Sequence, residues 1–434
     1  MPSEAYSEQL EIVPLAKAPK AVVSVPGSKS ITNRALVLAA QLWNDARLLK
    51  LTGALKSEDT EVMIDSLRRL GLHIETADAG ETVFIGWPEG GRPDPASADL
   101  FVANSGTTMR FLTAYVATGE GRYRLDGTPR MRERPIEDLL EALRQLRVNA
   151  CSEGGNGCPP VIVESSGLVG GKVVVKGDTS SQFLSALLMV APSAYGTVTV
   201  EVSGWVVSEP YVKMTVAMMR QFGMSIVQET PRRYRVEPSI RYGPQKYHIE
   251  PDASAASYFF AAAAITSGTV TVLGLSRKSI QGDVRFVDLL EQMGCRVEEC
   301  SSGITVHGRS LRGIDVDMND ISDTVMTLGA VACFAEGPTV IRNVAHIRHK
   351  ETDRIAALAT ELRKVGAEVE EHEGGLRITP RPLHGAEIDT YNDHRMAMSM
   401  ALIGLKVPGL VIRNPGCVAK TYPGFWQDLE RLRA

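Results

Sequence analysis

The sequence predicts an α/β protein of two similar domains, each assembled from three copies of one repeating unit. Three observations support this prediction. The chain of 434 residues is too long for a single hydrophobic core. A short polar turn that leads into an apolar helix recurs six times at nearly constant spacing. Amphipathic helices that end in glycine and continue into a strand-like segment lie between these recurrences.

The six apolar helices are predicted from segments that begin with small polar residues and continue in alanine, leucine and methionine. These segments are PGSKSITNRALVLAA (26–40), ANSGTTMRFLTAYVA (103–117), GDTSSQFLSALLMVA (177–191), PDASAASYFFAAAAI (251–265), ISDTVMTLGAVACF (321–334) and YNDHRMAMSMALIGL (391–405). One marker residue from each (Ser28, Ser105, Ser180, Ala255, Ser322 and Asn392) gives steps of 77, 75, 75, 67 and 70 residues. Helices that are apolar on nearly all faces belong in a protein interior, so we expect these six to be buried.

The amphipathic helices are predicted within residues 61–75, 213–229, 286–299 and 358–371. Each has a glycine suited to a helix C-terminus (Gly71, Gly223, Gly294 or Gly366), followed by the alternating apolar residues typical of a strand. The unit is therefore strand, buried helix, strand, exposed helix, strand. Three such units can enclose one core, so six units predict two domains of three.

Composition excludes several classes of protein. A hydrophobic fraction of 44% and a charged fraction of 23% are those of a globular protein, and the net charge of −4 argues against a general nucleic-acid binder. The six cysteines form no CxxC pair, the first 15 residues do not resemble a signal peptide, and the apolar run 256–268 is too short for a bilayer. We expect a cytoplasmic protein with no membrane or nucleic-acid partner.

Sequence motifs for common cofactors are also absent. The chain contains no GxxxxGK[ST] loop, because Gly27-Ser28-Lys29-Ser30 lacks the upstream glycine, and no HExxH or GxSxG motif. We therefore expect no cofactor and no metal ion. The helix starts suggest another chemistry, because a helix N-terminus attracts anions and several of these starts have cations close by. The cations are Lys29, Arg34, Arg110, Lys350, Arg395 and Lys420. The alternative is that the polar residues there are only N-caps.

Two charged segments extend the anion-binding hypothesis. In GTPRMRERPIEDL (127–139), Arg130, Arg132 and Arg134 alternate, so in an extended chain they would point the same way and suit a carboxylate or phosphate. A solvated loop is the alternative. In AHIRHKETDRIAAL (345–358), Lys350 and Arg354 are four residues apart and would share a helix face. The alternative there is a salt-bridged helix start.

Carboxylates near these cations are candidates for proton transfer. Glu351 follows Lys350, which would hold it ionised, and Asp323 lies at the fifth helix start, where an N-cap is the alternative. The charged triplet Asp393, His394 and Arg395 directly precedes an apolar helix, a position that packing alone explains poorly.

These residues lie in motifs that closely resemble the family of 5-enolpyruvylshikimate-3-phosphate synthases, the enolpyruvyl transferases of the shikimate pathway. The motifs are PGSKSITNRAL, NSGTTMRFL, PRMRERPI, SSQFLSALLM, SEPYVKMT, DASAASYFFAAAA, QGDVRF, KETDR, TYNDHRMAM and AKTYP, in family order along nearly the whole chain. The resemblance implies two domains, each of three βαβαββ repeats around buried parallel helices (an inside-out α/β barrel), with the active site in a hinge cleft. The implied domains are 1–27 plus 251–434, and 28–250, in a monomer.

The resemblance also implies a reaction and its residues. Phosphoenolpyruvate would be joined to the 5-hydroxyl of shikimate 3-phosphate through a tetrahedral ketal, with release of phosphate. Shikimate 3-phosphate would contact Lys29, Ser30, Arg34, Ser180, Ser181, Gln182, Ser208, Tyr211, Asp323, His346 and Lys350. Phosphoenolpyruvate would contact Lys29, Asn104, Gly106, Thr107, Arg134, Gln182, Arg354, His394, Arg395 and Lys420. Asp323, Glu351 and Lys29 are the implied catalytic residues.

The chain departs from common family patterns at several positions in and near these motifs, including His349, where relatives often have valine. Ala103 stands where relatives often have glycine, Phe111 where many have proline, and His346 where bacterial relatives often have asparagine. Gly106 is retained, so phosphoenolpyruvate is expected to fit, whereas Phe111 leaves sensitivity to the herbicide glyphosate open. The sister transferase that acts on UDP-N-acetylglucosamine normally has a cysteine before the Arg-Pro pair, and residues 127–135 contain none. A non-catalytic phosphometabolite-binding protein would not need Asp323 and Glu351.

Overall fold

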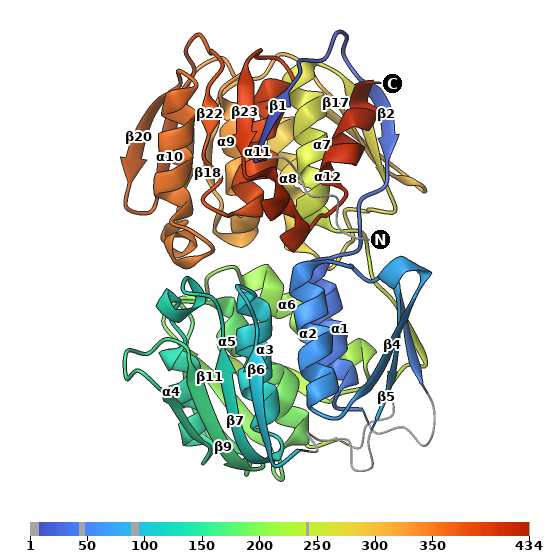
Figure 1. Ribbon diagram of the computed structural model, residues 1–434, viewed down its shortest axis with the longest axis vertical. Helices are drawn as coiled ribbons and strands as arrows, with labels where there is room; N and C mark the ends of the chain where they lie inside the picture. Colours follow the sequence, from blue (N-terminus) through green and yellow to red (C-terminus); the bar gives the residue numbers. More distant parts are fainter. Residues whose placement is uncertain (1–7, 43–47, 88–94, 240–242, 434) are drawn as a thin grey trace. The chain divides into compact units, whose positions relative to one another are not determined.

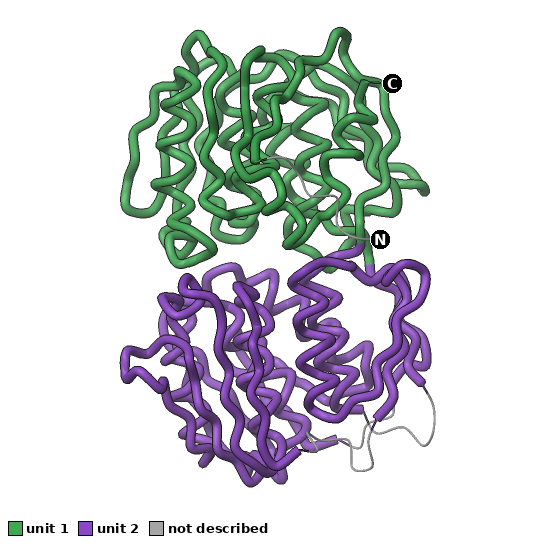
Figure 2. The backbone as a smooth tube through the Cα atoms, viewed as in Figure 1, with its two compact units in different colours: residues 1–26, 250–434 green, residues 27–249 purple. Residues whose placement is uncertain are grey.

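The computed structural model describes residues 8–42, 48–87, 95–239 and 243–433. Residues 1–7, where no signal peptide is expected, lie outside the described residues. The chain divides into two compact units, with residues 1–26 and 250–434 in unit 1 and residues 27–249 in unit 2 (Figure 2). Figure 1 gives the element labels used below.

The strands in the described part of unit 2 form three four-stranded sheets. Figure 1 labels several of these strands. The first has the order β14-β3-β5-β4, with β3 (Leu49–Thr52), β4 (His73–Ala77), β5 (Thr82–Gly86) and β14 (Lys246–His248). The second has the order β6-β7-β9-β8, with β6 (Ser97–Phe101), β7 (Glu120–Asp126), β8 (Asn149–Ser152) and β9 (Val161–Ser166). The third has the order β10-β11-β13-β12, with β10 (Gly171–Lys176), β11 (Val198–Ser203), β12 (Ile226–Thr230) and β13 (Arg233–Val236). In each sheet the first pair is parallel and the others are antiparallel.

The helices of unit 2 alternate with these strands. The apolar helices α1 (Lys29–Ala39), α3 (Gly106–Val116) and α5 (Ser181–Val190) are buried along almost their whole length. The amphipathic helices α2 (Glu58–Arg69), α4 (Glu137–Gln145) and α6 (Glu209–Gln221) bury one face only. The chain runs β6, α3, β7, α4, β8, β9 and then repeats this βαβαββ order from β10. The first repeat obtains its parallel edge strand from β14, at the other end of the unit.

Unit 1 repeats the same plan twice. The first copy comprises β2 (Lys20–Val23), α7 (Ala253–Thr266), β15 (Thr269–Leu273), α8 (Phe286–Met293), β16 (Arg296–Cys300) and β17 (Gly303–His307). The second comprises β18 (Asp315–Asp317), α9 (Val325–Ala332), β19 (Thr339–Arg342), α10 (Arg354–Lys364), β20 (Glu368–His372) and β21 (Gly375–Thr379). The sheet orders are β16-β17-β15-β2 and β18-β19-β21-β20.

The last copy differs from the βαβαββ expectation. It comprises β22 (Glu387–Ile388), α11 (His394–Gly404), β23 (Leu410–Arg413) and α12 (Phe425–Glu430). Its sheet has three strands, in the order β1-β23-β22, and β1 (Gln9–Ile12) comes from the beginning of the chain. The N-terminal segment thus pairs antiparallel with β23 and completes the sheet that the C-terminal segment leaves short.

The predicted α/β class and the six buried helices are confirmed. The helices α7, α9 and α11 are as completely buried as their counterparts in unit 2. The four predicted C-terminal glycines have φ of 98° at Gly71, 77° at Gly223, 115° at Gly294 and 101° at Gly366, all in the left-handed region. Because the apolar helices are buried, their polar N-terminal turns mark the ends of the core, and many of the candidate site residues lie at these turns.

Candidate active site

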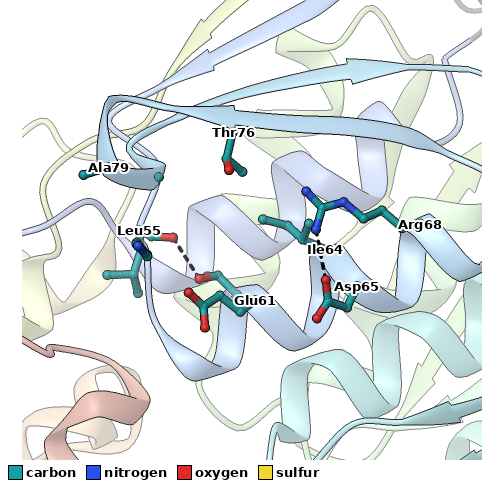
Figure 3. Close-up of a pocket in the computed structure, with 10 residues that line it drawn as sticks. Leu55, Glu61, Ile64, Asp65, Arg68, Thr76 and Ala79 are labelled. Carbon is teal, nitrogen blue, oxygen red and sulfur yellow. Dashed lines mark hydrogen bonds and ion pairs between the residues drawn. The ribbon is translucent and has the colours of Figure 1, made fainter. Parts of the chain in front are cut away.

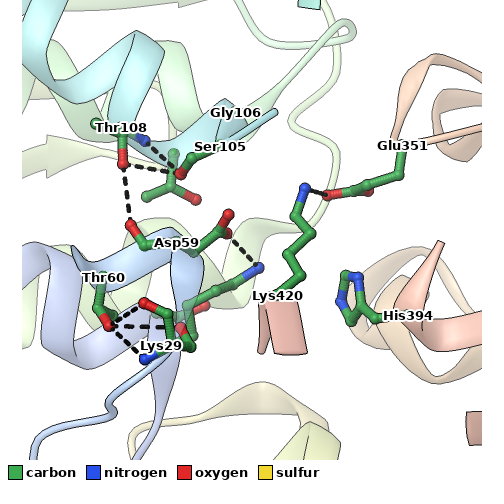
Figure 4. Close-up of polar contacts among 12 residues, drawn as sticks. Lys29, Asp59, Thr60, Ser105, Gly106, Thr108, Glu351, His394 and Lys420 are labelled. Carbon is green, nitrogen blue, oxygen red and sulfur yellow. Dashed lines mark hydrogen bonds and ion pairs between the residues drawn. The ribbon is translucent and has the colours of Figure 1, made fainter. Parts of the chain in front are cut away.

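The start of α1 places Lys29 beside a carboxylate. Ser28 caps the helix by accepting the N–H of Ile31 at 3.5 Å. The Nζ atom of Lys29 lies 3.3 Å from Oδ2 of Asp59 in the first turn of α2, and the two side chains are 13% and 5% exposed (Figure 4). Sequence reasoning missed Asp59, because an acidic residue in the first turn of a helix is ordinary.

Arg34 is buried among neutral groups. Its guanidinium donates to Oγ1 of Thr215 at 2.7 Å, to the carbonyls of Ser30 at 3.0 Å and Tyr211 at 3.3 Å, and to Oγ of Ser185 at 3.4 Å. It also lies over the ring of Phe111, at 5.2 Å from the ring centroid. Burial lowers the pKa of Arg34 to about 10, against a smaller opposing effect of Tyr211. The guanidinium nevertheless stays protonated at neutral pH and joins α1 to α5 and α6.

Two guanidinium groups enclose Gly106 at the start of α3. A Cβ atom at this position would lie 2.5 Å from Nη1 of Arg110 and 2.5 Å from Nη2 of Arg134. Arg134, which is 4% exposed, donates to the carbonyl of Asn104 at 3.2 Å and to its Oδ1 at 3.3 Å. The glycine therefore lets two cations approach a helix N-terminus, an arrangement that suits an anion.

The starts of α5 and α6 supply the remaining predicted residues of unit 2. Oε1 of Gln182 accepts from Arg110 at 3.0 Å, and its Nε2 donates to Oγ1 of Thr107 at 3.4 Å. Ser180 caps α5 by accepting the N–H of Gln182 at 3.3 Å, and Ser181 begins the helix. Ser208 precedes α6 with a φ of 52°. The α3 and α5 starts are therefore joined by direct hydrogen bonds.

The predicted arginine row at residues 130 to 134 is wrong. Met131 is fully buried and residues Met131–Glu133 form a 3₁₀ helix, so the segment is not extended and the three arginines do not share a side. Arg130 pairs with Glu133 at 2.8 Å and Arg132 pairs with Asp126 at 2.7 Å. Only Arg134 turns toward the α3 start.

In unit 1, three cations converge on Asp323. Its Oδ2 accepts from Arg395 at 2.7 Å, and its Oδ1 accepts from Lys350 and Arg354 at 3.2 Å each. Asp323 lies in a 3₁₀ helix (Asn319–Thr324), and α9 begins at Val325 after Thr324, so the N-cap alternative is wrong. The shared helix face predicted for Lys350 and Arg354 is also wrong, because α10 begins only at Arg354, yet both side chains reach the same carboxylate.

Two further carboxylates complete this network. Arg354, only 1% exposed, binds Asp393 through Nε at 2.8 Å and Nη2 at 3.2 Å, and Glu351 through Nη2 at 2.8 Å. Lys420 lies 3.2 Å from Oε1 of Glu351 (Figure 4). Burial disfavours the charge on Arg354, but the attraction of Asp393, Glu351 and Asp323 outweighs it and raises its pKa. Asp393 also caps α11, accepting the N–H of Arg395 at 2.9 Å.

The histidines of the network are buried to different degrees. Nε2 of His346 lies 3.0 Å from Oγ of Ser322, and burial together with Lys350 lowers the pKa of His346 to about 3, so it is neutral at physiological pH. His394 is 1% exposed, with Nδ1 3.7 Å from Oδ1 of Asp393. Burial also lowers the pKa of Lys350, against the attraction of Asp323.

Asp283 is a buried carboxylate near this network that sequence reasoning did not single out. It accepts the hydroxyl of Ser254, and burial followed by the repulsion of Asp323 raises its pKa to about 6. The QGDVRF motif that contains it was one of the signals available in the sequence.

A pocket of about 390 Å³ lies elsewhere in unit 2, between α2 and the β4–β5 hairpin (Figure 3). Leu55, Glu61, Asp65, Arg68 and Thr76 are among its lining residues, and Arg68 there donates to Asp65 at 3.0 Å. None of the predicted site residues lines this pocket. Within the described ranges, no cluster of His, Cys, Asp and Glu side chains could hold a metal ion, and no helix is long and apolar enough to cross a membrane.

Comparisons with known proteins agree with this chemistry. The family model described as EPSP synthase (3-phosphoshikimate 1-carboxyvinyltransferase) matches residues 16–429. The 3-phosphoshikimate 1-carboxyvinyltransferase of Nostoc punctiforme is 48% identical over 429 residues, covering 98% of this chain and 100% of the relative. That of Shewanella baltica is 45% identical over 428 residues, with the same coverage.

Solved structures give the same result for the fold. An EPSP synthase from Acinetobacter baumannii superposes with a TM-score of 0.81 at 28% identity, covering 98% of each chain. The enolpyruvyl transferase NikO from Streptomyces tendae shares the fold, with a TM-score of 0.75 at 21% identity and coverage of 98% of this chain and 96% of that one. The match over nearly the whole chain, together with the helix starts described above, shows that this chain belongs to the EPSP synthase family of 3-phosphoshikimate 1-carboxyvinyltransferases.

Proposed function

We propose that this chain transfers the enolpyruvyl group of phosphoenolpyruvate to the 5-hydroxyl of shikimate 3-phosphate, with release of inorganic phosphate. The observation that carries the proposal is that Arg34 and Arg134 are buried, at 2% and 4% exposure, and bind neutral oxygens. Their hydrogen bonds with the described side chains and carbonyls go to neutral oxygen atoms. A buried cation without an ionic partner is costly, and an anionic substrate would remove that cost.

The proposed binding roles follow the family motifs. Shikimate 3-phosphate binds to Lys29, Ser30, Arg34, Ser180, Ser181, Gln182, Ser208, Tyr211, Asp323, His346 and Lys350. Phosphoenolpyruvate binds to Lys29, Asn104, Gly106, Thr107, Arg134, Gln182, Arg354, His394, Arg395 and Lys420. Two phosphates and two carboxylates need many donors, and guanidinium groups bind such oxygens through paired hydrogen bonds. In this proposal the substrates displace part of the ion pairing around Asp323 and Glu351.

The proposed chemistry is addition followed by elimination. In the addition, the 5-hydroxyl oxygen bonds to C2 of phosphoenolpyruvate, its proton is removed, and the methylene carbon gains a proton. In the elimination, the new methyl group loses a proton, the double bond re-forms and the C2–O bond to phosphate breaks. Asp323 and Glu351 share the proton transfers, because both are carboxylates held by Arg354 within the network. Lys29 stabilises the charge that develops near the bridging oxygen.

We further propose that units 1 and 2 are the two domains expected from the sequence, and that both supply residues to the same pair of substrates. The hinge cleft, the monomeric state and the cytoplasmic location stay predictions.

The test is release of phosphate by the purified chain with both substrates present. Omitting either substrate should abolish release, and UDP-N-acetylglucosamine should not replace shikimate 3-phosphate. Lys29→Met should lower the rate by more than about 10²-fold, since a preorganised charge is lost. The matched variant Lys56→Met, at an exposed lysine beside α2, should keep the wild-type rate. Turnover with the nucleotide sugar alone would overturn the proposal.

A further inference from the structure

The turn between β22 and α11 has a backbone that its sequence does not favour. The carbonyl of Thr390 accepts the N–H of Asp393 at 2.8 Å, and the two central residues, Tyr391 and Asn392, both have a φ of 53°. Positive φ at both central positions is the signature of a type I′ turn, which glycine and asparagine favour. Tyr391 carries a Cβ and a bulky ring, so this conformation needs support from outside the turn.

One buried carboxylate supplies that support. Glu361 of α10 is 0% exposed, and its Oε1 accepts the hydroxyl of Tyr391 at 2.6 Å. Its Oε2 accepts the backbone N–H of Asp389 at 3.1 Å and lies 2.9 Å from Nζ of Lys364. Tyr391 itself is 41% exposed. The hydrogen bond of its hydroxyl, and not burial of its ring, therefore holds Tyr391 in place.

The same helix holds the far end of the turn through Arg354. Glu361 and Arg354 are seven residues apart on α10, which places them on one face about two turns from each other. Arg354 binds the carboxylate of Asp393, the residue that ends the turn and caps α11. Helix α10 therefore contacts the loop at two places. Glu361 binds Asp389 and Tyr391, and Arg354 binds Asp393.

We propose that the contact between Glu361 and Tyr391 is a positioning latch for the phosphoenolpyruvate-binding arginines. The latch fixes the left-handed turn, the turn fixes Asp393, and Asp393 fixes Arg354 and the first turn of α11 with Arg395. Tyr391 acts through these neighbours and is a positioning residue. The inference rests on the proposed roles of Arg354 and Arg395. It adds the prediction that the latch affects binding of phosphoenolpyruvate and not of shikimate 3-phosphate.

The first test is Tyr391→Phe, which removes the hydroxyl and keeps the exposed ring. The KM for phosphoenolpyruvate should rise about tenfold, because a hydrogen bond to a buried carboxylate is among the stronger ones. The KM for shikimate 3-phosphate should stay within about twofold. The thermal midpoint should fall by only about 1 to 3 °C, because Glu361 keeps its contacts with the Asp389 N–H and Lys364. The matched control is Tyr247→Phe, since that hydroxyl donates to Gln221 at 2.7 Å in unit 2, and both KM values should stay as in the wild type.

The second test is rescue by glycine. Tyr391→Gly removes the same hydroxyl and also lowers the cost of positive φ at that position, so its KM for phosphoenolpyruvate should be closer to the wild-type value than that of Tyr391→Phe. Equal rises in both KM values, or no rescue, would overturn the latch. If the wild type itself releases no phosphate, the proposed function fails. If the wild type turns over and Tyr391→Phe keeps the wild-type KM, only the latch fails.

Discussion

Replacing Asp323 by asparagine removes the charge on which three cations of unit 1 converge and keeps the shape of the side chain. Arg395, Lys350 and Arg354 donate to this carboxylate at 2.7, 3.2 and 3.2 Å, and the side chain is 13% exposed. Breaking a fully buried ion pair costs about 3 to 5 kcal/mol. Because Arg354 keeps Asp393 and Glu351, and the site is partly exposed, we expect a loss of about 3 kcal/mol in the free energy of unfolding.

The catalytic effect of Asp323→Asn should be larger than its effect on binding. An amide cannot accept the proton that a carboxylate accepts, so kcat should fall by about 10² to 10⁴-fold. Loss of the competing negative charge leaves the donors of the three cations more available to the anionic substrates, so the KM for phosphoenolpyruvate should fall or stay near the wild-type value. Phosphate release at saturating concentrations of both substrates measures kcat, and urea unfolding measures stability.

The control for this variant lies in the same 3₁₀ helix. Asp320 pairs with Arg285 at 2.9 Å, and the two side chains are 46% and 49% exposed. An exposed ion pair contributes about 0 to 1 kcal/mol, so Asp320→Asn should leave both activity and unfolding near the wild-type values. A kcat within tenfold of wild type for Asp323→Asn would refute the proton-transfer role, and an unchanged urea midpoint would refute the account of the network.

Three further predictions follow from single positions. Gly106→Ala introduces a Cβ 2.5 Å from both Arg110 and Arg134, so the KM for phosphoenolpyruvate should rise at least about tenfold with little change in the thermal midpoint; an unchanged KM would contradict the anion site at α3. Ala103 has a φ of 48°, so Ala103→Gly should stabilise the chain by about 1 kcal/mol in urea unfolding, whereas a destabilised variant would contradict the strain. His346 has a folded pKa of about 3 against an ordinary 6.5, so the unfolded chain binds the extra proton and stability falls as the pH drops below about 6.5. At about pH 5 this loss is about 2 kcal/mol, and His346→Gln should abolish it when unfolding is compared at about pH 5 and pH 7.5.

Most of the fold could be predicted because its signals are local. An N-cap followed by an apolar run, and a glycine that ends an amphipathic helix, depend on neighbours within one or two turns. The starts of α1, α3, α5, α7 and α11 follow these rules closely. The pairing of β14 with β3 and of β1 with β23 could not be predicted. Each pair joins strands from opposite ends of a unit, and such pairing depends on residues far apart in the sequence.

The candidate site was less predictable for the same reason. Asp323 resembled a helix cap, and only its cation partners from later segments of the chain distinguish it. Asp393 is harder still, because it does cap α11 and also binds Arg354. At residues 130 to 134, burial of Met131 outweighed the alternation of charges that suggested an extended segment.

The arginines that the sequence groups together differ in the partners that they bind in the structure. Arg348 belongs to the dense cluster before α10, but it binds Asp353 at 2.8 Å and Glu371 at 3.0 Å and so serves the fold. Arg132 does the same with Asp126. Arg34 and Arg134 are more deeply buried and bind neutral oxygens. A chain-supplied carboxylate does not by itself separate the two roles, because Arg354 and Arg395 also bind Asp323 in the network that we propose to open for the substrates. At Arg34 and Arg134 the described chain offers only neutral oxygens, so we propose that a bound substrate supplies the missing negative charge there.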